Sequence, residues 1–347
     1  MSDTAPVRPG EELDVNALRR YLSGVIEGAG DGVEVEQFPS GHSNLTYLLR
    51  TGGRQLVLRR APLGPVAPKA HDMAREYAVL ERLAPRYAPA PRPVHLCEDT
   101  SVIGAVFYLM ERREGAVLRT TVPDAHVAGG DHGQRISRTL IDGLVDLHRI
   151  DIVDSGPVDM GRPDGFLERQ VEGWAKRWAR ARTDDLPQIE RAIDHLRDTV
   201  PEPLPPTVVH NDYKLDNVML DPKDPDRLVA VLDWEMATVG DPLVDVGLSL
   251  VYWQQLSTPP AEQTELGAPG AAAGWYTREQ FIERYADRSG RDLSGIGWYE
   301  VLGVFKLAVI LQQIYHRYVR GQTSDDRFAH LDRRIALLAG AAQARVP

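Results

Sequence analysis

The chain has 347 residues, enough for two domains or lobes around a sizeable core. Its 43% hydrophobic and 26% charged residues are typical of a soluble globular protein, and no apolar run reaches the roughly 18 residues of a transmembrane helix. The formal charge of −10 argues against general nucleic-acid binding, and a single cysteine, Cys97, excludes an internal disulfide and a multi-cysteine zinc site.

Residues 1–14 lack the basic region and the apolar stretch of a secretory signal. Because the lone cysteine suits a reducing compartment, the sequence predicts a cytoplasmic protein. Cys97 itself is most simply a small buried side chain on a strand. We expect no membrane or nucleic-acid partner, and a monomer or homodimer.

The N-terminal part of the chain alternates apolar runs with turn residues. Apolar side chains near helical spacing predict helices over residues 13–26 and 73–83. Short apolar or alternating runs bounded by turn residues predict strands over 33–38, 45–50, 55–60, 94–97 and 102–110.

An abrupt change to polar residues at 111–115 predicts a boundary near Arg112, which gives domains 1–111 and 112–347. The second domain is expected to be mainly helical. Its apolar periodicity predicts helices over 132–150, 166–181, 188–200, 278–287, 298–320 and 327–341.

Residues 208–234 combine apolar strands with a polar loop of unusual composition. The loop and the strand that follows it contain His210, Asp212, Lys214, Asn217 and Asp233. Phosphoryl transfer from ATP needs a carboxylate near the attacking hydroxyl and oxygen ligands for magnesium. Asp212 suits the first role, and Asn217 and Asp233 suit the second. The alternative is an ordinary surface loop rich in Asp and Asn.

The order HNDYKLDN at 210–217 resembles the kinase catalytic loop, in which His-x-Asp is followed five residues later by Asn. Asp233, in LDWE, resembles the metal-binding Asp of the kinase DFG motif. The HND and DWE variants are similar to aminoglycoside phosphotransferases and choline kinase-like small-molecule kinases. The stretches LVLRRAP and REYAVLERL look closest to the branch that also occurs fused to acyl-CoA dehydrogenases.

The resemblance implies an α+β, two-lobed protein kinase-like fold, with a small antiparallel-sheet N-lobe and a mainly helical C-lobe. It implies ATP and Mg²⁺ as cofactors. Asp212 would then position the acceptor hydroxyl, while Lys214 either neutralises the transferring group or only bonds the loop. His210 would brace the loop.

The resemblance also assigns nucleotide-binding residues in the N-lobe. These are Ser40, Gly41, His42 and Ser43 over the phosphates, Arg59 at the usual lysine position, Glu76 as its partner, and Met110, Glu111 and Arg112 at the adenine hinge. The first three assignments have plainer alternatives: a hairpin loop, solvated edge-strand arginines, and a helix-surface glutamate. The glycine pattern is sparse, and arginine is not equivalent to lysine.

The residues after Asp233 favour a small substrate. Too few residues separate Asp233 from Gly240 for a protein-kinase activation loop. In GDPLVDVG, Asp245 is expected to be structural, as a partner of the catalytic-loop backbone or of His210. His148 is likewise expected to be a hydrogen-bonded structural histidine.

Together these patterns predict an ATP-dependent small-molecule kinase that transfers the γ-phosphate to an alcohol group. The alternative is a pseudokinase-like module that binds nucleotide without turnover. The acceptor is open among aminoglycosides, amino alcohols, sugars and hydroxyacyl thioesters. Candidates for its pocket are Tyr252, Trp253, Gln313, Tyr315, His316 and Arg317, with residues 257–273 as a lid.

Overall fold

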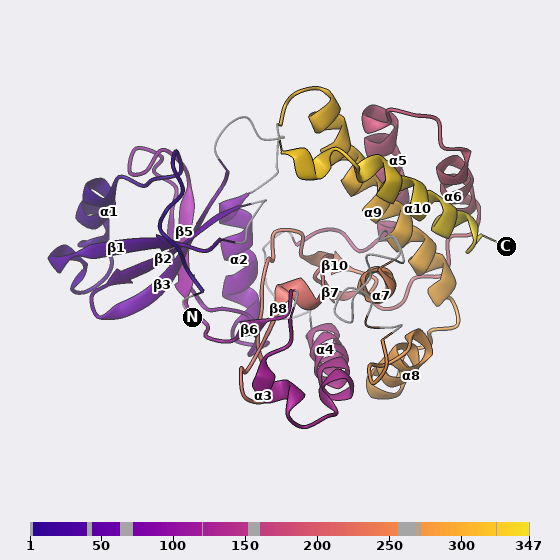
Figure 1. The fold of residues 1–347 in the computed structure, drawn as a ribbon, viewed down its shortest axis with the longest axis horizontal. Helices are drawn as coiled ribbons and strands as arrows, with labels where there is room; N and C mark the ends of the chain where they lie inside the picture. Colours follow the sequence, from indigo (N-terminus) through magenta and orange to yellow (C-terminus); the bar gives the residue numbers. More distant parts are fainter. Residues whose placement is uncertain are drawn as a thin grey trace. The chain divides into compact units, whose positions relative to one another are not determined.

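The computed structural model describes residues 3–39, 44–62, 72–119, 121–151, 160–255, 269, 272–323 and 325–346. The chain divides into two units, drawn as a ribbon in Figure 1. The first unit joins Met1–Gly115 to the short segment Val229–Glu235, and the second contains Ala116–Leu228 and Met236–Pro347. Asp233 therefore belongs to the first unit, although the catalytic loop belongs to the second.

The first unit is built on a five-stranded antiparallel sheet with the order β1-β2-β3-β5-β4. The strands are β1 (Val33–Gln37), β2 (Leu45–Thr51), β3 (Arg54–Arg60), β4 (Pro93–Cys97) and β5 (Phe107–Glu111). Helix α1 (Val15–Leu22) packs against β1, and α2 (Met73–Leu83) packs against β4 and β5. Cys97 is buried at the end of β4, as the sequence predicts.

Strand alternation places one face of this sheet in a buried apolar cluster. Leu56 and Leu58 of β3 lie opposite Leu49 and Tyr47 of β2, and all four join one buried apolar cluster. Burying such side chains stabilises each by about 1.5–3 kcal/mol. The opposite face of β3 carries Arg59. Because β3 is the central strand, the alternative of solvated edge-strand arginines is wrong.

The second unit is mainly helical. Its helices are α3 (Asp124–Val127), α4 (His132–His148), α5 (Phe166–Ala181), α6 (Pro187–Asp198), α7 (Leu243–Gln254), α8 (Arg278–Ser289), α9 (Ile296–Val319) and α10 (Leu331–Gln343). Helix α9 packs against α5, α7 and α10, and α4 packs against α8 (Figure 1). Among the described residues, no helix has both the length and the apolar content required to cross a membrane.

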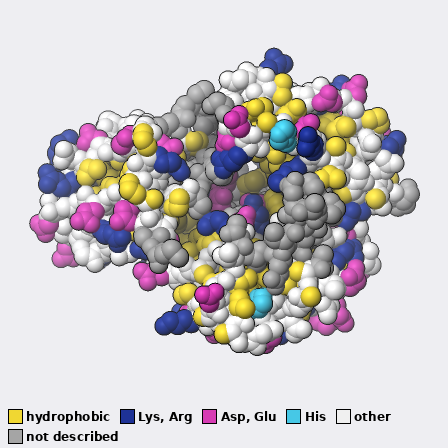
Figure 2. All heavy atoms as spheres, viewed as in Figure 1, with side chains coloured by type: hydrophobic (Ala, Val, Ile, Leu, Met, Phe, Trp, Pro, Cys, Tyr) yellow, Lys and Arg dark blue, Asp and Glu magenta, His cyan; other side chains and the backbone are white. Residues whose placement is uncertain are grey.

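Short strands frame the catalytic loop in the second unit. Strand β7 (Thr207–Val209) pairs with β10 (Thr238–Gly240), and β6 (Ala116–Val117) pairs with β8 (Val218–Leu220). Strand β9 (Leu228–Val231) carries the chain from the second unit into the first. On the face shown in Figure 2, acidic and basic side chains are interspersed with apolar ones.

The sequence predicts one strand too long. A strand was expected over residues 102–110, but β5 begins at Phe107. The preceding residues turn instead, with Val102 N–H bonded to Asp99 O and Gly104 in the left-handed region at φ 80°. Glycine adopts that conformation readily, so the apolar residues before it do not extend the strand.

Candidate active site

Asp212 lies on the loop that follows β7 and is partly buried, with 21% of its side chain exposed. Its Oδ1 accepts a hydrogen bond from the Tyr252 hydroxyl at 3.0 Å, and its Oδ2 accepts one from Asn217 Nδ2 at 2.8 Å. The ammonium group of Lys214 lies 3.0 Å from Oδ2 and 3.2 Å from Oδ1. The carboxylate is therefore fixed by three side chains.

Asn217 and Lys214 have further contacts that define their orientation. Asn217 ends a short 3₁₀ helix, Leu215–Asn217, and its Nδ2 also donates to the backbone oxygen of Asp212 at 2.8 Å. The amide nitrogen of Asn217 is therefore turned toward Asp212. Lys214 Nζ lies 4.7 Å from the ring centroid of Tyr252, a cation–π distance.

The backbone of the catalytic loop is fixed by Asp245 at the start of α7. The carboxylate accepts hydrogen bonds from the backbone N–H groups of His210 and Asn211, both at 2.6 Å, and lies 3.2 Å from His148 Nε2. Burial opposes its ionisation, but the contacts with His148 and His210 outweigh burial and lower the pKa of Asp245. The structural roles expected for Asp245 and His148 are confirmed.

Lys306, on α9, supports the same loop and was not found from the sequence. Its ammonium group donates to the backbone oxygen of Asn211 at 2.8 Å and to the Asn211 side-chain oxygen at 3.2 Å. Burial lowers the pKa of Lys306 to about 8. Its one signal in the sequence is a lone lysine inside the apolar run GVFKLAVIL.

In the first unit, Arg59 bridges two carboxylates. Its Nη2 lies 3.2 Å from Glu76 Oε1 on α2 and 2.9 Å from Asp233 Oδ1. Glu76 also accepts the backbone N–H of Trp234 at 3.2 Å, so α2 fixes the residue after Asp233. Asp233 itself has a left-handed φ of 66°, uncommon for a non-glycine residue.

Burial strongly shifts the pKa of Glu76 in this cluster. Burial raises the pKa of Glu76 to about 7, although the Arg59 guanidinium favours the ionised carboxylate. Arg59 Nε is also buried, and it has no hydrogen-bond partner among the described residues. The helix-surface alternative for Glu76 is wrong, because this side chain is only 1% exposed.

Glu235 is held close to the start of β2. Its Oε2 accepts a hydrogen bond from Asn44 Nδ2 at 2.9 Å, and its backbone oxygen accepts one from Arg75 at 2.9 Å. Asn44 directly follows Ser40, Gly41, His42 and Ser43, which lie outside the described residues.

The expected hinge residues lie at the end of β5 and directly after it, in the first unit. Met110 pairs with Val57 and Pro93 in the sheet. The backbone N–H of Glu111 donates to Arg92 O at 2.9 Å, and the carboxylate of Glu111 lies 2.6 Å from the guanidinium of Arg113. The guanidinium of Arg112 lies 2.9 Å from Asp3 Oδ1. The side chains of Glu111 and Arg112 are therefore engaged within this unit.

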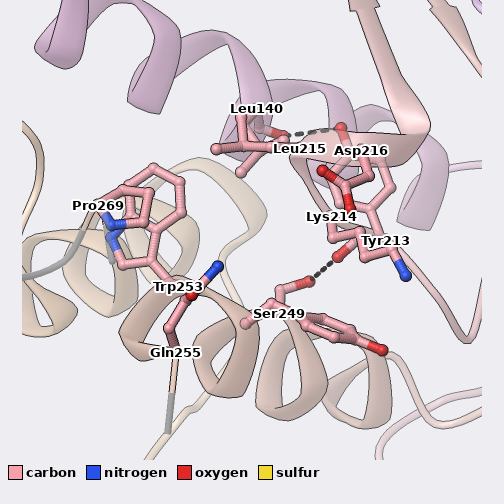
Figure 3. A pocket seen from close by; sticks show the side chains of 10 residues that line it. Leu140, Tyr213, Lys214, Leu215, Asp216, Ser249, Trp253, Gln255 and Pro269 are labelled. Carbon is pink, nitrogen blue, oxygen red and sulfur yellow. Dashed lines mark hydrogen bonds between the residues drawn. The ribbon is translucent and has the colours of Figure 1, made fainter. Parts of the chain in front are cut away.

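A small cavity of about 50 Å³ lies beside the catalytic loop in the second unit (Figure 3). Its lining residues are Leu140, Tyr213, Lys214, Leu215, Asp216, Ser249, Tyr252, Trp253, Gln255 and Pro269. Two hydrogen bonds join residues of the cavity wall. Tyr213 OH donates to Leu140 O at 2.9 Å, and Ser249 Oγ donates to Tyr213 O at 2.8 Å.

Two of the acceptor-pocket candidates, Tyr252 and Trp253, line this cavity. The candidates on α9 do not, and one of them, His316, contacts Ala181 O through Nδ1 at 3.0 Å. The proposed lid, residues 257–273, lies mostly outside the described residues.

The antiparallel sheet, the helical second unit and the HND and DWE motifs define a kinase-like phosphotransferase fold. The chain belongs to the phosphotransferase enzyme family, whose model matches residues 34–281. The fold class predicted from the sequence is thereby confirmed.

Among known proteins, the chain is 34% identical to acyl-CoA dehydrogenase family member 10 of Mus musculus, over 93% of this chain and 30% of that protein. It is 33% identical to acyl-CoA dehydrogenase family member 11 of Homo sapiens, over 94% of this chain and 42% of that protein. The chain thus spans about a third to two-fifths of these relatives. They confirm the predicted likeness to the branch fused to acyl-CoA dehydrogenases.

Solved structures agree with this assignment. A candidate aminoglycoside phosphotransferase from Ralstonia eutropha superposes with a TM-score of 0.80 and 31% identity, covering 96% of this chain and 98% of the other. A thermostable mutant of aminoglycoside phosphotransferase APH(4)-Ia, in complex with AMP-PNP and hygromycin B, has a TM-score of 0.59 and 18% identity, covering 94% and 99%. The second likeness concerns the fold alone.

Proposed function

We propose that this chain is an ATP- and magnesium-dependent phosphotransferase that moves the γ-phosphate of ATP to a hydroxyl group of a small molecule. The observation that carries the proposal is the Asp212 carboxylate, which Asn217, Lys214 and Tyr252 hold. Two of these partners, Lys214 and Tyr252, also line the cavity. A carboxylate in this position can orient an acceptor hydroxyl and take its proton.

The chain offers side chains of the types that bind magnesium and phosphates. We assign Asn217 Oδ1 and the Asp233 carboxylate to magnesium, because both are hard oxygen ligands, which Mg²⁺ prefers. Magnesium, when bound, supplies positive charge that stabilises the transferring phosphoryl group. Arg59, whose Nε has no partner among the described residues, is the cation that we assign to the phosphates.

We also propose roles for the remaining residues. Lys214, which lies 3.0 Å from Asp212, is assigned to stabilise the negative charge that develops at the transferred group. Glu76 holds Arg59 in place. Ser40, Gly41, His42 and Ser43 are proposed to cover the phosphates, and Met110, Glu111 and Arg112 to contact adenine. The acceptor is a small hydroxylated compound.

One observation favours a second candidate function, a nucleotide-binding module without turnover. Arg59 forms an ion pair with Asp233 at 2.9 Å, so the cation proposed for phosphate is engaged by the carboxylate proposed for the metal. Turnover requires that phosphate and magnesium compete successfully with this pair.

Measuring ADP release by the purified protein distinguishes the two functions. Wild type with Mg·ATP is assayed against a panel of aminoglycosides, amino alcohols, sugars and hydroxyacyl thioesters. Asp212→Asn and Asp233→Asn should each lower the rate at least about 100-fold, because a proton acceptor or metal ligand is lost. Asp198→Asn, an exposed aspartate at the end of α6, is the matched control and should keep full activity.

If wild type binds ATP but no acceptor raises ADP release above the water background, the transferase assignment fails. Persistence of that background in Asp212→Asn would also contradict it. ATP binding with no hydrolysis at all would support the module without turnover.

A further inference from the structure

Oδ1 of the Asp212 carboxylate already accepts two hydrogen bonds. An ionised carboxylate has about four acceptor positions, two on each oxygen. Tyr252 and Lys214 each donate to Oδ1, while Asn217 donates to Oδ2, and the Lys214 ammonium group also lies 3.0 Å from Oδ2. An acceptor hydroxyl can therefore bond to Oδ1 only by replacing Tyr252 or Lys214.

Two of the three donors are poorly suited to leave. Asn217 donates through the same nitrogen to the backbone oxygen of Asp212, so its displacement breaks two hydrogen bonds. Lys214 is a charged partner within ion-pair distance of Asp212, and losing it would leave a partly buried carboxylate without its counter-charge.

Tyr252 is different, because it contributes one neutral hydrogen bond to Asp212 from the wall of the cavity. An incoming alcohol offers the same O–H group, so the exchange preserves the number and type of hydrogen bonds on the carboxylate. Because the phenolic oxygen is fixed in the plane of the ring, its displacement requires the ring of Tyr252 to turn away from Asp212.

The Tyr252 hydroxyl remains a donor at ordinary pH. Burial, together with the negative charges of Asp212 and Asp216, raises its pKa well above the usual value of 10. The phenol is therefore neutral when the acceptor arrives.

We propose that the Tyr252 hydroxyl occupies the place of the acceptor hydroxyl when no acceptor is bound, and that a small alcohol entering the cavity displaces it. This inference rests on the proposed phosphotransferase function. Tyr252 acts through Asp212 as a positioning residue. Its hydroxyl also keeps water from Oδ1 of Asp212, and thus limits wasteful transfer of phosphate from ATP to water.

The cavity restricts what can make this exchange. A volume of about 50 Å³ holds a few waters or the hydroxyl-bearing end of a molecule, and apolar walls come from Leu140, Leu215 and Trp253. The class of ligand is thus an alcohol whose hydroxyl stands on a slim carbon framework, with the rest of the molecule outside the cavity.

The test is the rate of ATP hydrolysis without acceptor in Tyr252→Phe, which removes one oxygen and keeps the ring. Freeing Oδ1 of Asp212 should admit water and raise this rate about fivefold or more, since the displaced bond is a typical hydrogen bond. The apparent KM for an alcohol acceptor should fall, because no internal hydroxyl competes. Tyr318→Phe, on α9 and away from the cavity, is the matched control and should change neither quantity.

Adding Asp212→Asn to Tyr252→Phe should abolish the gain, because the gain acts through the carboxylate. Circular dichroism and the Tm establish that each variant is folded. Hydrolysis in Tyr252→Phe that is unchanged or slower, with KM unchanged or higher, would overturn the inference. Wild type that releases no ADP with any acceptor would instead mean that the proposed function itself is wrong.

A second readout does not depend on turnover. In protein labelled with ¹³Cζ-tyrosine, the Tyr252 resonance is identified by its absence from Tyr252→Phe. It should shift in Asp212→Asn, where the partner is altered, and shift in the same direction when wild type is titrated with glycerol as a probe alcohol. A resonance unaffected by both changes would also overturn the inference.

Discussion

The ammonium group of Lys306 donates to two oxygens of one residue, the backbone and side-chain carbonyls of Asn211, at 2.8 and 3.2 Å. Asn211 has a left-handed φ of 66° and directly precedes Asp212. A backbone conformation of this kind costs about 1–3 kcal/mol unless its surroundings hold it. The buried lysine therefore helps to keep the catalytic loop in the geometry that presents Asp212.

Lys306→Met should change how stability depends on pH. Burial lowers the pKa of Lys306 from 10.5 to about 8. The negative charges of Asp245 and Asp212 oppose this shift, and the positive charges of Arg177 and Lys214 add to it. Between these two pH values the unfolded chain binds the proton and the folded protein does not. The free energy of unfolding of wild type should thus rise with pH, relative to Lys306→Met, by about 1.4 kcal/mol per pH unit.

Urea denaturation of both proteins at pH 7, 8, 9 and 10 measures this difference. Below pH 8 it should be flat, since the lysine is protonated in both states. Hydrogen exchange of the amides at 210–213 should also be faster in Lys306→Met. A stability difference that stays constant from pH 7 to 10 would contradict the pKa assignment.

Arg59→Met should weaken both folding and nucleotide binding. The substitution leaves Glu76 nearly buried, and Asp233 partly buried, without their common cation. Breaking a buried ion pair by removing one partner costs about 3–5 kcal/mol. If Arg59 holds phosphate, the affinity for Mg·ATP should also fall at least about tenfold. Arg59→Lys should lose less in both measurements, since it keeps the charge.

Calorimetric titration with Mg·ATP and urea denaturation measure the two effects separately. Arg54→Met, at the exposed start of the same strand, is the control and should change little. Unchanged Mg·ATP affinity in folded Arg59→Met would remove Arg59 from the phosphate site.

Asp245→Asn should weaken the hydrogen bonds that hold the backbone of the catalytic loop. The carboxylate accepts two backbone N–H groups at 2.6 Å and lies near His148. An asparagine offers one acceptor oxygen and turns a donor toward the other partners, so a buried polar group is left unpaired. We expect a loss of about 2–4 kcal/mol in the free energy of unfolding. Urea denaturation checks this, and a loss under 1 kcal/mol would mean that the loop has other support.

Strong local patterns account for what could be predicted from the sequence. Helices α2 and α5 begin and end where their apolar periodicity does. Asp212 and Asn217 were found because the spacing of the motif is local, five residues along one loop, and their side chains indeed meet. The strand before Phe107 was overextended because a glycine turn overrides apolar composition.

Contacts between distant residues could not be predicted in the same way. Tyr252 meets Asp212 across 40 positions, and Lys306 meets Asn211 across 95. Neither α7 nor α9 shows which of its polar residues faces the loop, since both helices are apolar on nearly every side. The segment containing Asp233 joins the first unit through Arg59 and Glu76. This contact depends on the folded chain, so no local pattern in the sequence could predict it.

Gly247→Ala should disturb α7, the helix that carries Ser249 and Tyr252. A Cβ atom at Gly247 would lie 2.5 Å from the backbone carbon and oxygen of Tyr299 on α9. These are backbone atoms, which cannot rotate away from the contact as a flexible side chain could. We expect a loss of about 1–3 kcal/mol as the two helices move apart. Gly340→Ala is the matched control, because α10 leaves open space at this position and alanine favours helix by roughly 0.5–1 kcal/mol. Urea denaturation should move the two midpoints in opposite directions, and a stabilised Gly247→Ala would contradict the close packing of α7 on α9.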